Sequence, residues 1–150
     1  MNSTNITDSH IFGPVPSRRL GLSLGVDLIP SKTCTFDCLY CEVGKTTDRT
    51  LRMRPYVPVN EVLEQVRRKL LVCRPDIITL AGSGEPTLHS EIDQIIDGIK
   101  TFTDTRVAVL TNGSLFWDKE VRRRVQGADI IMPTLSSALD QTFRKIHKPH

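Results

Sequence analysis

The chain has 150 residues, of which 39% are hydrophobic and 25% are charged, and its formal net charge is +3. This composition is ordinary for a globular protein and excludes a chain that is disordered throughout, and the length suits one domain or part of a larger one. No apolar run approaches the ~18 residues that a membrane span needs, and residues 1–10 lack the apolar stretch of a signal peptide. We therefore expect a cytoplasmic protein without a membrane segment, with a disordered N-terminal tail over residues 1–10.

Strand-like and helix-like segments alternate along the chain. An apolar run over residues 22–29 predicts the first strand, and apolar residues at helical spacing predict an amphipathic helix over 60–72, which Pro75 ends. The later strands are predicted at 76–81, 106–110 and 129–132, and the later helices are expected to begin near Ser90, Trp117 and Ser137.

This order of strand then helix, four times over, predicts an α/β fold with right-handed crossovers and a parallel sheet covered by helices. In such sheets the active groups lie on loops that follow the carboxyl ends of the strands. Four features fall at those ends: the cysteine-rich loop after the first strand, the turn at 82–86, the turn at 111–113, and Thr134. We expect these features to converge on one face of the protein.

Cysteine usage carries the strongest chemical signal. Three of the four cysteines lie within eight residues, at Cys34, Cys38 and Cys41. Clustered thiols in a cytosolic chain indicate metal or redox chemistry, because disulfides are rare there. Zinc sites favour a second pair of ligands, and none follows here, so we interpret Cys73 as a core residue and His147 and His150 as unliganded. Three thiolates at one place can hold three irons of a [4Fe–4S] cluster and leave the fourth iron open.

The spacing Cys-x-x-x-Cys-x-x-Cys after a first strand, with a Gly-Glu-Pro turn after a second, resembles the radical S-adenosylmethionine (SAM) superfamily. The stretch IFGPVPSRRLG at 11–21 is similar to one branch, the Fe–S oxidoreductases related to the wyosine-forming tRNA enzymes. This resemblance implies a radical SAM core domain over residues 11–150. Its fold would be a partial TIM-like (β/α)6 barrel, of which about the first four βα units are present, so we expect a core truncated at the C-terminus.

The resemblance also implies roles for individual residues. The three loop cysteines would ligate three irons, and the fourth iron would bind the amino and carboxylate groups of SAM. Tyr40 matches an aromatic position near the adenine. A motif whose backbone meets the SAM amino group is matched by Ser83, Gly84, Glu85 and Pro86, with serine in place of the first glycine. Cofactor-contacting turns after the third and fourth strands are matched by Asn112 and Thr134.

The chemistry that the resemblance implies is the reductive cleavage of SAM to a 5′-deoxyadenosyl radical, which abstracts hydrogen from a substrate. The cofactor would carry the difficult step, and the protein would bind it and exclude water. The implied partners are SAM, an electron donor such as flavodoxin or ferredoxin, a second subunit or C-terminal half that completes the barrel, and tRNA as a candidate substrate. Residues 45–74 hold eight basic and three acidic groups, which suits an anionic partner, although a solvated loop and helix face is the simpler explanation.

Two alternatives stay open at the level of the sequence. The first is a non-catalytic Fe–S or zinc-binding module that acts with a partner and recruits Cys73 as a fourth ligand. The second is a radical-activating enzyme that installs a glycyl radical on a partner protein, against which the Pro-Ser-Arg-Arg segment at 16–19 weighs. In every case we expect Glu85 to hold the fold as a hydrogen-bond acceptor more than to act as a catalytic acid.

Overall fold

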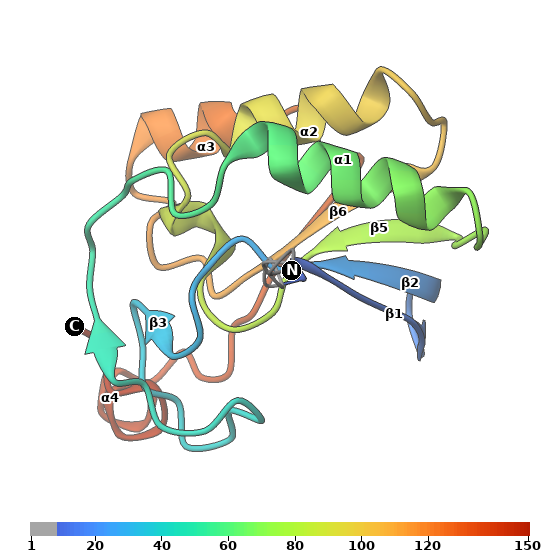
Figure 1. Ribbon diagram of the computed structural model, residues 1–150. Coiled ribbons are helices and arrows are strands. Elements are labelled where there is room, and N and C mark those ends of the chain that lie inside the picture. The colour runs from blue at the N-terminus through green and yellow to red at the C-terminus, as the bar shows by residue number, and fades with distance from the viewer. Residues whose placement is uncertain (1–8) are drawn as a thin grey trace, which may run out of the picture.

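The computed structural model describes residues 9–150, so residues 1–8 of the predicted disordered tail lie outside the described part. A five-stranded sheet in the order β1-β2-β5-β6-β7 forms its centre (Figure 1). These strands span Ile11–Ser17, Gly21–Val26, Ile77–Leu80, Arg106–Thr111 and Ile130–Pro133. The last four strands pair in parallel, as predicted from the alternation of strands and helices.

The first strand was not predicted from the sequence. β1 pairs antiparallel with β2, in a hairpin whose register shifts between Phe12 and Val15. Gly13, Pro14 and Pro16 interrupt the apolar pattern of β1, and proline in a strand is tolerated at an edge, which is where β1 lies. β2 ends at Val26 and not at residue 29, because the chain turns away at Asp27, whose carboxylate accepts a hydrogen bond from the Ile29 amide.

Three helices cover one face of this sheet, as Figure 1 shows. They are α1 (Val59–Leu70), α2 (Ile92–Lys100) and α3 (Lys119–Val125). Alternate residues of the parallel strands point at this face and join the apolar stripes of the helices in one core. Its fully buried members include Leu24, Val26, Ile78, Leu80, Val107, Val109, Val62, Val66, Ile92, Ile95, Ile96, Ile99, Val121 and Val125. Burial of each such side chain stabilises the fold by roughly 1.5–3 kcal/mol.

The fourth helix does not join this layer. α4 (Asp140–His147) lies apart from the other helices, beside the short strand β3 (Thr33–Cys34), which pairs with β4 (Asp48–Arg49) (Figure 1). Backbone hydrogen bonds join the two regions, since the amides of Asp37 and Leu39 donate to the carbonyls of His147 and Ile146, both at 2.9 Å. The sequence predicts the helix itself but not this docking, which places α4 against the cysteine loop.

No helix in the described residues is long and apolar enough to cross a bilayer. The mixed α/β architecture with its parallel sheet and successive βα units is that of a partial barrel, as the sequence indicates.

Candidate functional site

The predicted site residues gather at the carboxyl edge of the sheet, where the parallel strands end. The cysteine loop follows β2 and is held by β3, which ends at Cys34. Tight turns carry the next two cysteines, since the Cys41 amide donates to the Cys38 carbonyl at 3.2 Å and the Gly44 amide to the Cys41 carbonyl at 3.1 Å. All three cysteines line one cavity of about 90 Å³, together with Ser83 and Gly84.

The electrostatics of this cavity disfavour uncompensated thiolates. Burial raises the pKa of Cys34, and it raises the pKa of Cys38 to about 11. Repulsion from the neighbouring sulfurs of Cys34 and Cys41 contributes to the shift at Cys38. Thiolates at these positions would therefore need a compensating positive charge, such as a metal centre supplies.

The spacing of the ligands argues against a single metal ion. Across residues 9–150, no three histidine, cysteine or acidic side chains converge closely enough to hold one ion. A zinc ion would require its ligand atoms within about 2.0–2.3 Å of one centre. In a [4Fe–4S] cluster each cysteine binds a different iron, so the three sulfurs stand further apart. The described side chains therefore do not form a single-ion site.

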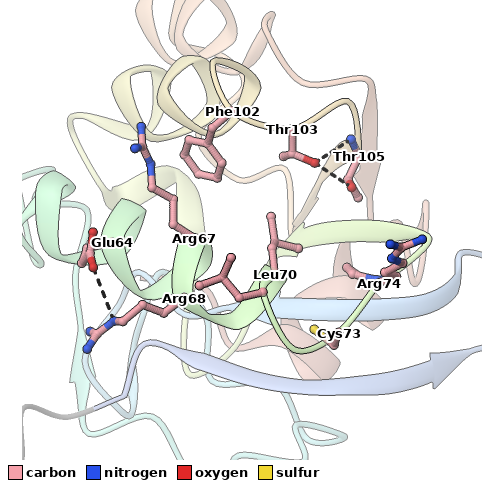
Figure 2. A pocket seen from close by; sticks show the side chains of 11 residues that line it. Glu64, Arg67, Arg68, Leu70, Cys73, Arg74, Phe102, Thr103 and Thr105 are labelled. Carbon is pink, nitrogen blue, oxygen red and sulfur yellow. Dashed lines mark hydrogen bonds and ion pairs between the residues drawn. The ribbon is translucent and has the colours of Figure 1, made fainter.

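Cys73 lies at the opposite, amino edge of the sheet, where α1 ends and the chain enters β5. Its thiol donates to the Lys69 carbonyl at 3.2 Å, and it is half-buried. Figure 2 shows Cys73 in a different cavity, of about 640 Å³, in which the Arg67 guanidinium stacks over the Phe102 ring at 4.4 Å. The alternative in which Cys73 joins the loop cysteines as a fourth ligand therefore has no geometric support.

The turn after β5 is packed tightly against the cysteine loop. The Ser83 amide and hydroxyl both donate to Oδ2 of Asp27, at 3.0 and 2.5 Å, and the Ser83 carbonyl accepts from the Lys32 amide at 3.2 Å. A Cβ on Gly84 would lie 1.8 Å from the Thr33 carbonyl oxygen, so only glycine allows this approach. Serine in place of the usual first glycine thus gains a partner in Asp27.

Glu85 lies beneath the cavity and not in it. The residue is 2% exposed, and its carboxylate accepts four hydrogen bonds: from the Thr87 amide and hydroxyl, the Thr111 hydroxyl and the Asn112 amide, over 2.6–3.1 Å. Burial raises the pKa of Glu85, and these hydrogen bonds oppose the shift. Pro86 is buried as well and begins the 3-10 turn η1 (Pro86–Leu88). Glu85 therefore ties the turns after β5 and β6 together, in the fold-holding manner expected from the sequence.

Asn112 reaches the cysteine loop from the turn after β6. Its Nδ2 donates to the Thr35 hydroxyl at 2.8 Å and lies 3.8 Å from the Cys34 sulfur. The Ser114 hydroxyl also donates to Thr35, at 2.7 Å. The Asn112 side chain therefore points an N–H group toward the Cys34 sulfur, a candidate ligand, and fixes the cysteine loop through Thr35.

Tyr40 and Thr134 lie at the rim. The Tyr40 hydroxyl is hydrogen-bonded to Ser136 at 3.0 Å and lies 3.5 Å from Nδ1 of His147. Thr134 is exposed, and its amide donates to the Thr111 carbonyl at 3.0 Å. Thr134 does not line the cavity of the cysteines, whereas Tyr40 connects the cysteine loop to the loop before α4.

Sequence reasoning missed two residues that the structure brings to the site. Asp27 anchors the Ser83 turn as described above, and because it lies inside the strand predicted over 22–29, nothing in the sequence marks it as a site residue. His147 is fully buried, and its Nδ1 lies 3.1 Å from the Cys38 sulfur, at a distance of 109 residues along the chain. Burial lowers the pKa of His147. No local pattern marks this histidine.

The basic segment at 45–74 does not form one surface. Lys45 lines a hollow with Cys38, Cys41 and Lys148 at the carboxyl edge. The arginines near the end of α1, by contrast, surround the cavity of Figure 2 at the amino edge. The second group lies at the carboxyl-terminal end of α1, a 12-residue helix about 18 Å long. Only the first group could face a substrate at the cysteines.

Comparison with known proteins gives one family and several relatives. The family model of the radical SAM superfamily matches residues 28–150. A UPF0026 protein of Methanocaldococcus jannaschii is 37% identical over 142 residues, which are 93% of this chain and 44% of that protein. A probable GTP 3′,8-cyclase of Saccharolobus solfataricus is 30% identical over 114 residues, which are 75% of this chain and 35% of that protein.

A further relative, from Brachyspira hyodysenteriae and named GTPase Obg, is 39% identical over 148 residues, which are 98% of this chain and 22% of that protein. The chain contains Gly44-Lys45-Thr46, but Leu39 stands where a phosphate-binding P-loop has its first glycine. The matched region therefore carries no complete P-loop. Across these three relatives the chain spans less than half of each protein's length.

Proposed function

The chain belongs to the radical SAM superfamily, and from this premise we propose that it binds a [4Fe–4S] cluster through Cys34, Cys38 and Cys41 and cleaves SAM reductively. The single observation that carries the proposal is the cavity that all three cysteines share with the Ser83–Gly84 turn. Three thiolates leave one iron of such a cluster without a protein ligand, which is the position that SAM would occupy.

The residue types at this site are those that these cofactors require. Thiolates are the soft, anionic ligands that Fe–S clusters require. When bound, the cluster supplies one electron to the sulfonium of SAM and so starts radical chemistry in the protein. The chain's own residues hold the site around it: Asp27 orients the Ser83 turn, and Asn112 fixes the loop that carries Cys34. The backbone of the Ser83–Gly84 turn would meet the SAM amino group, and the Lys32 amide holds this turn by donating to the Ser83 carbonyl.

We assign the other predicted residues to the rim of the same site. Tyr40 lies between the cysteines and the loop before α4, where its ring would pack against the adenine. Asn112 contributes from the turn after β6, and Thr134 from the turn after β7. Glu85 and Pro86 act from beneath by fixing the turn, since both are buried.

The substrate and partners of the whole protein are part of this proposal. Radical cleavage needs an electron donor such as flavodoxin or ferredoxin, and a second subunit or C-terminal half would complete the barrel beyond β7. A tRNA substrate gains support from Lys45 and Lys148, which place positive charge beside Cys38 and Cys41. Binding of tRNA should therefore weaken in Lys45→Glu with Lys148→Glu, should fall steeply with salt, and should be unaffected by Arg68→Glu with Arg74→Glu at the amino edge. Equal loss in both pairs, or no binding at low salt, would remove tRNA from the proposal.

Only one of the two alternatives differs from the proposal in its response to SAM. A non-catalytic Fe–S or zinc module would bind metal without responding to SAM. A radical-activating enzyme would respond to SAM in the same way and differ only in transferring the radical to a partner protein. No observation on the described residues favours such a partner.

The test is an EPR spectrum of the full chain, reconstituted anaerobically with iron and sulfide and reduced with dithionite, with and without SAM. We expect a [4Fe–4S] signal that changes when SAM is added and is absent from Cys38→Ala. A cluster signal indifferent to SAM would leave the non-catalytic module, and bound zinc without any cluster would overturn the proposal.

A further inference from the structure

His147 is a polar side chain buried without an evident structural reason. Its ring is fully buried at the end of α4, and its Nε2 has no hydrogen-bond partner among residues 9–150. Aromatic rings surround it, with centroid distances of 4.5 Å to Phe143, 5.1 Å to Phe36 and 5.7 Å to Tyr40. The ring has two polar contacts, both at Nδ1: the Cys38 sulfur at 3.1 Å and the Tyr40 hydroxyl at 3.5 Å. A leucine or phenylalanine would satisfy the packing alone, so the imidazole has another use.

The backbone fixes this ring relative to the cysteine loop. The carbonyls of Ile146 and His147 accept from amides on either side of Cys38, at Leu39 and Asp37, as described above. After the helix, Lys148 adopts a left-handed conformation (φ 44°), and its carbonyl accepts from the Arg49 guanidinium at 2.9 Å. The Nδ1–sulfur contact is therefore held by hydrogen bonds on both sides of it and does not depend on one flexible side chain.

The tautomer of His147 follows from what surrounds its two nitrogens. A neutral imidazole carries one N–H. If the proton were on Nε2, a buried donor would lack a partner and the lone pair of Nδ1 would face the sulfur, which is unfavourable once Cys38 is a thiolate. With the proton on Nδ1, the ring donates a charge-assisted hydrogen bond to the sulfur. Ligation of Cys38 to iron would therefore select the Nδ1–H form.

We propose that the Nδ1–H of His147 donates a hydrogen bond to the Cys38 thiolate and thereby makes the bound cluster easier to reduce. The inference rests on the proposed function, because it assumes a cluster at the three cysteines. Hydrogen bonds to ligand sulfurs are one of the means by which proteins set cluster potentials, since they stabilise the added negative charge of the reduced state. His147 is thus a positioning residue that acts through Cys38 and does not touch substrate.

The test is an EPR-monitored redox titration of the full chain, reconstituted anaerobically, in the wild type and three variants. His147→Leu removes the donor, His147→Asn retains an N–H close to the place of Nδ1, and His150→Leu is the matched control at an exposed histidine of the same tail. At the wild-type midpoint potential, we expect the ratio of reduced to oxidised cluster to fall about tenfold in His147→Leu, equivalent to about 59 mV for one electron. We expect His147→Asn to recover most of this loss and His150→Leu to match the wild type.

A second measurement needs no destabilising variant. In wild-type chain labelled with ¹⁵N-histidine, pulsed EPR of the reduced cluster should show a weak coupling to one histidine nitrogen, which disappears in His147→Asn. Absence of that coupling from a loaded cluster, or a coupling strong enough for direct iron ligation, would overturn the inference, as would an unchanged potential in a loaded His147→Leu. If the wild type itself takes up no cluster, the proposed function fails and the inference with it, so the two failures are distinguishable.

Discussion

Replacing Gly84 with alanine should separate the turn after β5 from the cysteine loop. The new Cβ would stand 1.8 Å from the Thr33 carbonyl oxygen and 2.7 Å from Cγ2 of Ile29. Non-bonded contacts of Cβ atoms essentially never fall below 3.0 Å, so the two backbones must move apart by about 1.2 Å. The carbonyl oxygen belongs to the backbone and cannot rotate away as a side chain would. Overpacking of this kind costs about 1–3 kcal/mol.

The displacement matters more for metal binding than for stability. Thr33 directly precedes Cys34, and metal–ligand distances tolerate deviations of only about 0.2 Å. We therefore expect Gly84→Ala to lose most of its iron after anaerobic reconstitution, measured as iron per folded chain, while its circular dichroism remains that of the wild type.

Gly98→Ala is the matched control for this substitution. Its Cβ would also approach too closely, at 2.6 Å, but the neighbour is the end of the flexible Leu63 side chain on α1, remote from the cysteines. The alanine also favours the helix by about 0.8–1.0 kcal/mol, which offsets much of the clash. We expect this variant to retain its iron. Normal iron content in Gly84→Ala would refute the view that the turn supports the cysteine loop.

Three further outcomes are expected. Alanine at any one of the three loop cysteines should abolish iron binding, whereas Cys73→Ala should not, and iron loss in Cys73→Ala would mean that the ligands are misassigned. In the metal-free protein, the rate at which iodoacetamide alkylates Cys38 should rise with pH, with a midpoint toward pH 11, because burial raises the pKa of this thiol. Peptide mass spectrometry measures the alkylated fraction. A midpoint near that of a free cysteine would contradict the burial. Because the folded-state pKa lies above the unfolded value, this thiol stabilises the metal-free fold below about pH 9, and that contribution is lost as the pH rises toward 11. Glu85→Gln should place an amide N–H against one of the four donors around the carboxylate and cost about 1–3 kcal/mol of folding free energy, measured as a lower melting temperature. The control is Glu42→Gln at an exposed position, which should leave the melting temperature unchanged.

Much of the sheet could be predicted because its signals are local. The run Ile77–Leu80 is short, apolar and bounded by turn residues, and the stripe of α1 repeats at helical spacing, so both elements appear close to their predicted bounds. The same logic correctly indicated that loops after the strands would meet. β1 was missed because Gly13 and two prolines break the alternation by which strands are recognised.

The details of the site depended on contacts that a local pattern cannot contain. The apolar stripe of α4 predicts that one face is buried but not what covers it, and the cover is the cysteine loop and not the sheet. Asp27 and Ser83 are 56 residues apart, so their hydrogen bond cannot be predicted before β2 and β5 are known to be neighbours in the sheet. The sequence predicts that His147 is unliganded, and nothing near it in the sequence indicates a cysteine partner.

The docking of α4 on the cysteine loop also bears on when the site can form during synthesis. Amides at residues 37 and 39 find their acceptors more than 100 residues later, so closing this contact carries the entropic cost of a long loop. Contacts of such high sequence separation form late compared with local helices. The three thiols therefore leave the ribosome well before the segment that fixes them. If a cluster is inserted during synthesis, the cysteine loop is not yet held by α4. The loop is fixed in position only after α4 has folded.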